Sequence, residues 1–272
     1  MYQSLDKFMK YFTYKKCFSV LFLCLIFSCK KESIALNSTE ALTSVVTKNI
    51  DLTPTSTTNQ IIYHTNYTLS YVEKYEQAEW VAYTLSKRNL KQHNFKRPYF
   101  IQDNKVTTHS ADWRNYKKSG YDKGHLCPAG DMTFSFDAYE ETFLTSNISP
   151  QKHNFNSGVW NRLEQKTRYW AEKMGDLYVI SGGVLNPKLK TIGYEKVAVP
   201  NYFYKIIASQ KNGQVKVIAF LVPHEELKQP LYSFVTSVDE IEKLTNIDFF
   251  SKLEDTLENT IEKNSDYKGW SF

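Results

Sequence analysis

Residues 119–132 read Ser-Gly-Tyr-Asp-Lys-Gly-His-Leu-Cys-Pro-Ala-Gly-Asp-Met and carry the most informative pattern in the chain. Their histidine, His125, directly follows a glycine and lies close to Asp122 and Lys123. Glycine allows a close backbone approach or a positive φ, and histidine can accept a proton from water near pH 7. A single histidine is more often structural, but this setting favours a general base. We expect structural positions for the other histidines: His64, His93, His109, His153 and His224.

A second group of polar residues follows at short intervals and comprises Asn147, Gln151, Asn156, Glu164 and Arg168. A general base, a neutral oxygen ligand, a carboxylate and cations in this order suit metal-assisted attack of water on a phosphodiester. A zinc site built from histidine and cysteine is disfavoured, because the sequence lacks pairs of these residues at ligand spacing. The pattern therefore predicts a hydrolytic site that uses an oxygen-ligated cation.

This order and spacing resemble the DNA/RNA non-specific endonuclease family, whose motif reads Asp-Arg-Gly-His with a metal-binding asparagine downstream. The resemblance covers roughly residues 60–250. It implies that His125 is the general base that activates the attacking water and that Asn156 is the metal ligand. It also implies that Glu164 orients water held by the metal and that Arg168 contacts phosphate. The implied cofactor is Mg²⁺, with Mn²⁺ as an alternative.

The remaining matches to the family concern substrate contacts and further cations. Asn147 and Gln151 match polar positions on the substrate side, and Arg97 matches an upstream catalytic arginine. Lys123 stands where the family has arginine, and we include it among the catalytic residues because lysine keeps the positive charge. Lysine lacks the two parallel donors of arginine, so we expect a lower rate or a shifted substrate preference.

Each of these assignments has a simpler structural alternative. Asn156 can serve as a helix N-cap, and this role does not exclude metal binding. Glu164 and Arg168 can form an ordinary i,i+4 surface pair worth about 0.2–0.5 kcal/mol. One neutral ligand is physically reasonable for Mg²⁺, which sheds water reluctantly and commonly keeps several. Asp122 and Asp131 are not assigned to the metal, because they can brace the loop by hydrogen bonds.

The N-terminal residues have the features of a secretory leader. Several lysines precede the apolar run 18–27, which is too short to cross a membrane as a helix. The run leads into Leu-Ile-Phe-Ser-Cys at 25–29, which looks like a bacterial lipoprotein box and predicts lipidation of Cys29. A plain secretory signal is the alternative. We expect a signal peptide at 1–28, a lipidated cysteine and flexible tether at 29–60, and a single nuclease domain at 61–272.

Cysteine usage and charge add two constraints. Of the 4 cysteines, only Cys127 lies in the expected folded part, so we expect no intramolecular disulfide. Cys127 lies near His125, but a small buried apolar residue fits this position better than a nucleophile does. The formal net charge is +5, of which the leader contributes +3 and the remainder +2. Nucleic-acid binding would therefore need a local basic surface.

The apolar pattern predicts an α+β fold, which we expect as a mixed central sheet with flanking helices and the family's ββα-metal nuclease motif. The most regular helix is expected at 155–174, with a buried stripe that includes Val159, Leu163, Trp170 and Met174. Further helices are expected at 79–85, after a capping box at 237–240, and at 255–263. Extended segments are expected at 63–72, 98–101, 141–146, 177–181, 196–199, 202–208 and 215–222, with a hairpin turn at 212–213.

These features favour an exported enzyme, lipid-anchored in the bacterial cell envelope, that cuts DNA and RNA without sequence preference. The resemblance implies products with 5′-phosphates, and the protein would be secreted if Cys29 is not lipidated. One alternative is a non-catalytic envelope lipoprotein that binds nucleic acid on the same fold. Another is a purely structural envelope lipoprotein. If neutral His125 is the base, cleavage should fall below roughly pH 6.5, the usual pKa of histidine.

Overall fold

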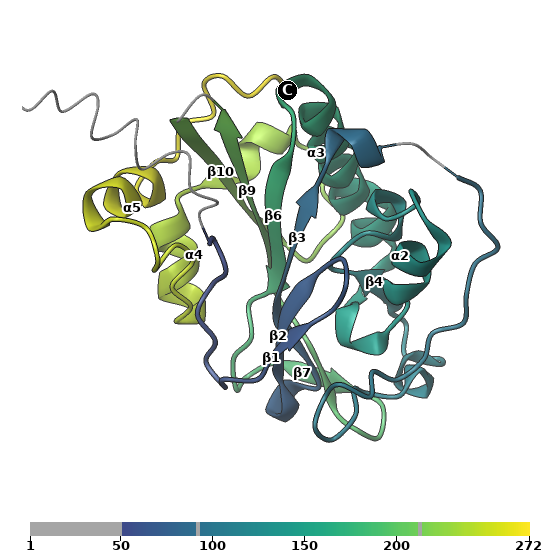
Figure 1. Cartoon of the computed structure of the whole chain (residues 1–272). Coiled ribbons are helices and arrows are strands. Elements are labelled where there is room, and N and C mark those ends of the chain that lie inside the picture. The colour runs from purple at the N-terminus through teal and green to yellow at the C-terminus, as the bar shows by residue number, and fades with distance from the viewer. Residues whose placement is uncertain (1–50, 91–92, 212–213) are drawn as a thin grey trace, which may run out of the picture. The chain divides into compact units, whose positions relative to one another are not determined.

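The computed structural model describes residues 51–90, 93–211 and 214–272, which form a seven-stranded sheet flanked by helices (Figure 1). Neighbouring strands in this sheet are antiparallel. Their order in space follows their order along the chain, and the chain leaves the sheet twice, between the third and fourth strands and between the fourth and fifth. In spatial order the strands are β1 (Ile61–Tyr63), β2 (Thr68–Val72), β3 (Gln77–Leu85), β6 (Leu177–Gly183), β9 (Tyr202–Lys211), β10 (Gln214–Pro223) and β11 (Val235–Thr236).

Two short antiparallel pairs lie outside the main sheet. One joins β4 (Asp122–His125) to β5 (Ile148–Gln151), and the other joins β7 (Lys190–Ile192) to β8 (Val197–Val199). The expected α+β class is confirmed by this combination of strands and helices. The α-helices are α2 (Phe136–Glu141), α3 (Asn161–Met174), α4 (Val238–Thr245) and α5 (Asp255–Glu262).

The helices cover both faces of the main sheet (Figure 1). On one face, Trp170 of α3 belongs to the same buried cluster as Phe203 of β9. On the other face, Ile241 of α4 and Ile261 of α5 share a buried cluster with Tyr204 of β9. Phe203 and Tyr204 are consecutive, so their side chains point to opposite sides of the strand. We call the two sides the α3 face and the α4/α5 face.

Four predicted strands in the second half of the chain are confirmed as β6, β8, β9 and β10. These segments are rich in β-branched and aromatic residues, which favour a pleated, buried surface. The predicted turn at 212–213 lies outside the described residues. Lys211 nevertheless pairs with Gln214, so β9 and β10 form the expected hairpin.

Three predicted elements are wrong. Residues 79–85 belong to strand β3 and not to a helix, because Trp80 and Tyr83 bury opposite faces of the strand in separate clusters. A short strand buried on both faces lacks alternation and resembles a helix in sequence. Residues 98–101 contribute only an isolated bridge from Ile101 to Leu144. Residues 141–146 close α2 and enter a 3-10 turn, because the helix continues to Glu141 and Leu144 then makes only the isolated bridge to Ile101.

The predicted helix at 155–174 is confirmed, but it begins irregularly. Residues Phe155–Trp160 form a π-helical segment in which Gly158 has φ −98° and ψ −107°. Regular α3 follows, and the predicted apolar stripe is buried except for Met174, which is partly buried. Single-turn π segments occur frequently at functional sites.

The two C-terminal helices each begin at a residue whose side chain caps the helix. Ser237 Oγ accepts a hydrogen bond from the backbone N–H of Glu240 at 3.3 Å, so α4 starts at the predicted capping box. Glu254 caps α5 by accepting a hydrogen bond from the backbone N–H of Leu257 at 3.2 Å. The helix predicted at 255–263 is thereby confirmed as α5.

Residues 51–60 contact the folded domain, although their composition places them in the tether. Trp80 Nε1 donates to the carbonyl oxygen of Thr55 at 2.8 Å, and the backbone N–H of Thr57 donates to Glu79 Oε1 at 2.9 Å. The predicted signal peptide and Cys29 lie outside the described residues. Among the helices of the described ranges, none is long and apolar enough to cross a membrane.

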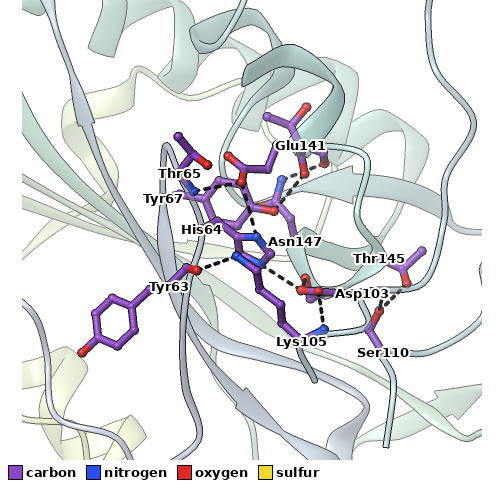
Figure 2. Close-up of polar contacts among 12 residues, drawn as sticks. Tyr63, His64, Thr65, Tyr67, Asp103, Lys105, Ser110, Glu141, Thr145 and Asn147 are labelled. Atoms are coloured by element: carbon purple, nitrogen blue, oxygen red, sulfur yellow. Dashed lines mark hydrogen bonds and ion pairs between the residues drawn. The ribbon is translucent and has the colours of Figure 1, made fainter. Parts of the chain in front are cut away.

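A buried polar network ties the start of the fold to the segments around the site (Figure 2). His64 Nε2 lies 2.8 Å from Asp103 Oδ2, and its Nδ1 lies 3.5 Å from Glu141 Oε1. Burial alone would lower the pKa of His64, but the hydrogen bonds to the two carboxylates raise it. Burial would raise the pKa of Glu141, but hydrogen bonds from His64, Thr65 and Asn66 hold it at about 2. His64 therefore joins the two carboxylates in a structural role, as expected for a histidine outside the motif.

Candidate active site

Strand β4 carries the predicted base, and β5 fixes its position. Gly124 and His125 pair with Ser149 and Ile148 of β5. A Cβ on Gly124 would lie only 2.2 Å from Cδ of Gln151, so glycine is required beneath this side chain. Gln151 is fully buried, and its amide makes no hydrogen bond with the described residues. Its predicted substrate contact stays a prediction.

His125 is half-buried between two aromatic rings. Its ring centroid lies 5.6 Å from that of Phe100 and 5.1 Å from that of Phe143. Its Nε2 is buried and has no hydrogen-bond partner among the described residues. Burial and the positive charge of Arg97 lower the pKa of His125 to about 3. The imidazole is therefore neutral near pH 7, the state in which it can accept a proton.

The two predicted cations of this group lie around the same rings. The guanidinium carbon of Arg97 lies 5.5 Å from the centroid of Phe100, and Lys123 Nζ lies 5.2 Å from the same centroid. Burial and the charge of Arg97 lower the pKa of Lys123. Within the described part of the chain, neither cation has a carboxylate within ion-pair distance. They therefore form the local positive charge that phosphate binding requires.

Asn156 is oriented by an acidic neighbour in β4. Its Nδ2 donates to Asp122 Oδ2 at 3.0 Å, and His153 Nδ1 lies 3.0 Å from the same oxygen. Donation by Nδ2 leaves the amide oxygen free, and no described residue donates a hydrogen bond to it. Asn156 is not the helix N-cap, because Asn154 occupies that position and makes no side-chain cap bond. An uncommitted amide oxygen is a suitable ligand for Mg²⁺.

A buried histidine anchors the chain just before Asn156. Nδ1 of His224 lies 2.8 Å from the carbonyl oxygen of Pro200, and its Nε2 accepts a hydrogen bond from the backbone N–H of Lys152 at 2.6 Å. The backbone N–H of Asn156 in turn donates to the carbonyl oxygen of Lys152 at 2.9 Å. Burial lowers the pKa of His224 to about 4, which favours a neutral ring that donates through Nδ1.

Glu164 and Arg168 belong to a larger network and not to an isolated surface pair. Arg168 Nε lies 2.5 Å from Asp131 Oδ1, and its Nη2 lies 3.7 Å from Glu164 Oε2. Asp131 also accepts a hydrogen bond from the hydroxyl of Tyr83 at 2.7 Å. The side chains of Glu164 and Arg168 are only 14% and 21% exposed. Asp131 therefore braces Arg168, which links the loop after His125 to α3.

A buried lysine lies behind this network. Lys205 of β9 is fully buried, and its Nζ donates to Ser181 Oγ at 2.5 Å. Its Nζ also lies 4.8 Å from the ring centroid of Trp160. Burial raises the pKa of Glu164 to about 7, although the positive charges of Lys205 and Arg168 oppose this rise. Both the protonated and the ionised form of Glu164 are therefore populated near neutral pH.

The predicted site residues fall into two groups. Arg97, Lys123 and His125 surround the rings beside β4, and Asn156 joins them through Asp122. Glu164 and Arg168 form the second group with Asp131. No hydrogen bond or ion pair between described residues joins the two groups directly. The helical segment 155–174 carries members of both and therefore connects them.

Asn147 does not have the geometry predicted for a substrate contact. It is fully buried, and its Oδ1 accepts a hydrogen bond from the backbone N–H of Cys127 at 2.8 Å. Its Nδ2 donates to the carbonyl oxygens of Cys127 and Thr142, both at 3.0 Å. Asn147 instead fixes the loop after His125 to the end of α2. The thiol of Cys127 is buried and burial raises its pKa, so the small structural role predicted for it is confirmed.

Two participants were missed in the sequence. Lys205 interrupts the apolar strand Tyr-Phe-Tyr-Lys-Ile-Ile at 202–207, and a charge in a buried strand is a signal that could have identified it. Tyr83 had no such signal, because its partner Asp131 is distant in sequence. Asp122 was expected only to brace its loop, and it also orients Asn156.

The arrangement agrees with the similarity of the chain to known proteins. Residues 48–256 match the family described as DNA/RNA non-specific endonuclease. The chain is 38% identical over 212 residues to a protein named "Nuclease EXOG, mitochondrial" from Danio rerio, covering 71% of this chain and 61% of that one. It is 35% identical to the Homo sapiens protein of the same name, covering 71% and 57% of the two chains. The chain thus spans about three fifths of the length of these mitochondrial relatives.

Two further matches cover more of the related protein. A protein named "Nuclease" from a Nostoc species is 32% identical over 232 residues, covering 79% of this chain and 82% of that one. Among solved structures, this chain is similar to one from a crystal structure of the EndoG/EndoGI complex, a structure titled for the mechanism of EndoG inhibition. The TM-score is 0.67 and the sequence identity is 27%. That match covers 72% of this chain and 87% of the solved one.

Proposed function

This chain belongs to the DNA/RNA non-specific endonuclease family, and we propose that it is a metal-dependent nuclease that hydrolyses phosphodiester bonds of DNA and RNA without sequence preference. The observation that carries the proposal is the grouping of a neutral histidine, two unpaired cations and an asparagine with a free amide oxygen. Arg97, Lys123, His125 and Asn156 supply these groups. Together they offer a proton acceptor, phosphate-binding charge and a cation ligand.

The residues present fit an oxygen-ligated divalent cation. Asp122 fixes the amide group of Asn156 through its nitrogen, so the amide oxygen is the atom left to bind a cation. We propose Mg²⁺, which prefers oxygen ligands and keeps several waters, and Mn²⁺ is the alternative. Bound there, the cation would polarise the phosphate and neutralise charge on the leaving oxygen.

His125 is the proposed general base. Its low pKa comes from burial and from Arg97, and a phosphodiester bound to Arg97 and Lys123 would counter that positive charge. The pKa of His125 would then rise toward the value that makes proton transfer from water efficient. Substrate binding would thus strengthen the base at the moment it is used.

Glu164 and the arginines have supporting roles in this proposal. In its ionised form Glu164 accepts a hydrogen bond from water and so orients it, and Arg168 beside it binds phosphate oxygens. Asp131 holds Arg168 in place through its Nε, which leaves other guanidinium donors for the substrate. Attack of water on phosphorus would expel the 3′-oxygen and leave a 5′-phosphate.

A nicking assay tests the proposal. The full chain should convert supercoiled plasmid to nicked and linear forms, and it should also degrade RNA. EDTA should stop both reactions, Mg²⁺ should restore them, and Zn²⁺ should not be the best restorer. Binding of DNA without nicking would instead support the non-catalytic nucleic-acid-binding protein.

The chemistry of the products is a separate test. Nicks that carry 5′-phosphates can be sealed by DNA ligase without prior kinase treatment. The same ends accept label from polynucleotide kinase only after a phosphatase has removed the phosphate. Nicks that ligase cannot seal would contradict the proposed direction of cleavage.

We further propose that the protein is exported and held in the bacterial cell envelope by lipid on Cys29. The support is the sequence at 25–29 alone. Fatty-acid labelling of the wild-type protein and of Cys29→Ser tests it: label should enter the first and not the second. Equal labelling of both would contradict the anchor, and release into the medium without labelling would support plain secretion.

A further inference from the structure

The α4/α5 face carries a second cluster of acidic side chains, remote from His125. Its central residue is Glu262, the last residue of α5, whose carboxylate is shared by two groups of potential cation ligands. The first group adds Asp239 and Glu242 of α4, and the second adds Asp248 and Glu258.

Glu262 differs from an ordinary surface acid in its burial. Only 7% of the residue is exposed, and its Oε1 is buried without a hydrogen-bond partner among the described residues. A buried carboxylate oxygen without a partner loses its hydration and gains nothing in return, which is costly. A proton or a bound cation would therefore stabilise the Glu262 carboxylate, and no described residue supplies a hydrogen bond to its Oε1.

The spacing of the oxygens suits a cation. In each group of three residues, one oxygen per carboxylate lies within 4.8 Å of the other two. Two oxygens that bind the same Ca²⁺ at about 2.4 Å can be at most about 4.8 Å apart. Asp239 and Glu242 are three residues apart on α4, so their side chains share one face of the helix.

The nearby lysines do not neutralise the cluster. Lys243 pairs with Glu240 at 2.6 Å, and Lys252 pairs with Asp51. Burial, followed by the negative charges of the other four carboxylates, raises the pKa of Glu262 to about 8. Among the described residues, negative charge is therefore concentrated around the buried carboxyl group of Glu262.

We propose that Glu262, with Asp239 and Glu242, binds a divalent cation of the calcium type on the α4/α5 face. All the ligands are carboxylate oxygens, which suit Ca²⁺ and disfavour Zn²⁺ and Cu²⁺. Asp248 and Glu258 add further negative charge around the same glutamate. The ion would join the C-terminal end of α5 to the first turns of α4, and so stabilise the outer layer of the fold without taking part in cleavage.

Thermal unfolding of the full chain, freed of metal with EDTA and titrated with CaCl₂ alone, tests the proposal. We expect the Tm to rise by roughly 5–10 °C at about a hundred times the Kd. The rise should persist in Asn156→Ala, which lacks the proposed ligand of the active site. It should be lost in Glu262→Gln, which keeps the shape of the side chain and removes its charge.

A neighbouring acid on the same helix provides a matched control. Glu240 is exposed, lies in the first turn of α4 and is outside both ligand groups, so Glu240→Gln should keep the full rise in Tm. If Glu262→Gln folds poorly, Asp239→Asn provides the same test at a less buried ligand. Calorimetry should then show a higher Kd for Ca²⁺ than in the wild type. The proposal is overturned if Ca²⁺ leaves the wild-type Tm unchanged, if the rise survives Glu262→Gln, or if it disappears in Asn156→Ala.

Discussion

Two buried glutamates, one on each face of the sheet, are set in opposite electrostatic surroundings. Burial raises the pKa of both, Glu164 to about 7 and Glu262 to about 8. Glu164 on the α3 face has Arg168 and buried Lys205 to oppose that rise. For Glu262 on the α4/α5 face, the strongest charge influences among the described residues are other carboxylates, which add to the rise. Positive side chains of the protein therefore offset the negative charge of Glu164. Glu262 instead needs a proton or a cation from solution to offset its charge.

This contrast predicts a clean separation of effects. Changes on the α3 face should alter cleavage with little effect on the Ca²⁺ response. Changes around Glu262 should alter that response and leave cleavage intact. Each of the following measurements can confirm or break the separation.

The largest effect is expected at the general base. His125→Ala should lower the rate of plasmid nicking by about 10²–10⁴-fold, because proton removal from water is lost. Its Tm and its Ca²⁺ response should stay near those of wild type, because the ring makes no hydrogen bond with the described residues. His93→Ala, a change of an exposed histidine, is the control. Wild-type nicking by His125→Ala would refute the proposed role of this residue.

The next effect concerns the charge behind Glu164. Lys205→Met removes a positive charge that favours the ionised carboxylate, so the pKa of Glu164 should rise above about 7. A rise of one pKa unit corresponds to about 1.4 kcal/mol and would reduce the ionised fraction at pH 7 several-fold. In a plot of kcat/KM against pH, the fall on the acidic side (the acidic limb) should move to higher pH. Activity should be recovered in alkaline buffer. An unmoved limb would show that Lys205 is only structural.

The structure changes the expectation, drawn from the sequence, of which residue sets the fall in cleavage at low pH. A fall in cleavage below about pH 6.5 was expected from protonation of His125. Burial and Arg97 instead keep the pKa of free His125 near 3, while that of Glu164 is about 7. The structure therefore predicts that Glu164, and not His125, sets the acidic limb of kcat/KM. Glu262→Gln should leave this limb where it is, because Glu262 lies on the other face.

At the proposed cation ligand, the quantity expected to change is the Mg²⁺ requirement. Asn156→Ala should raise the Mg²⁺ concentration for half-maximal cleavage by roughly tenfold or more, since even an outer partner of a metal ligand is worth 10–100-fold in affinity or activity. Asp122→Asn should shift it in the same direction, because Asp122 orients the amide of Asn156. Unchanged Mg²⁺ titration curves for both variants would exclude Asn156 as the ligand.

The smallest effect is expected at Lys123. Lys123→Ala should reduce turnover several-fold, and Lys123→Arg should keep or raise it, because guanidinium offers two parallel donors to phosphate oxygens. Neither variant should change the Ca²⁺ response. Equal and near-normal cleavage by both variants would show that charge at this position has no part in the reaction.

Local patterns predicted much of this molecule, and contacts between distant segments account for what they missed. The helix at 155–174 and the β9–β10 hairpin follow from spacing and residue type within single segments. Strand β3 was mistaken for a helix because both of its faces are buried, which only the tertiary structure reveals. The residue types of the site were readable from the motif, since His125 and Asn156 stand at matching positions in this sequence.

The supporting contacts of the site could not be predicted in the same way. Asn147 has the polar side chain expected of a substrate contact, but its bonds to Cys127 and Thr142 are made inside the fold. Lys205 and Tyr83 approach the site from strands distant in sequence. No local pattern specifies such neighbours, because the sheet brings them together only after the chain has folded.

The departure of the chain from the sheet between β3 and β6 also bears on the order of folding. These strands are neighbours, yet residues 86–176 separate them, and every residue proposed to contact water, metal or phosphate lies in that excursion. Closing a loop of this length costs about 4 kcal/mol in chain entropy by the logarithmic rule, whereas the β9–β10 hairpin closes almost at once. We expect hairpins to form early and the β3–β6 pairing late. A partly folded chain would then already have much of its sheet but would be unable to cut nucleic acid.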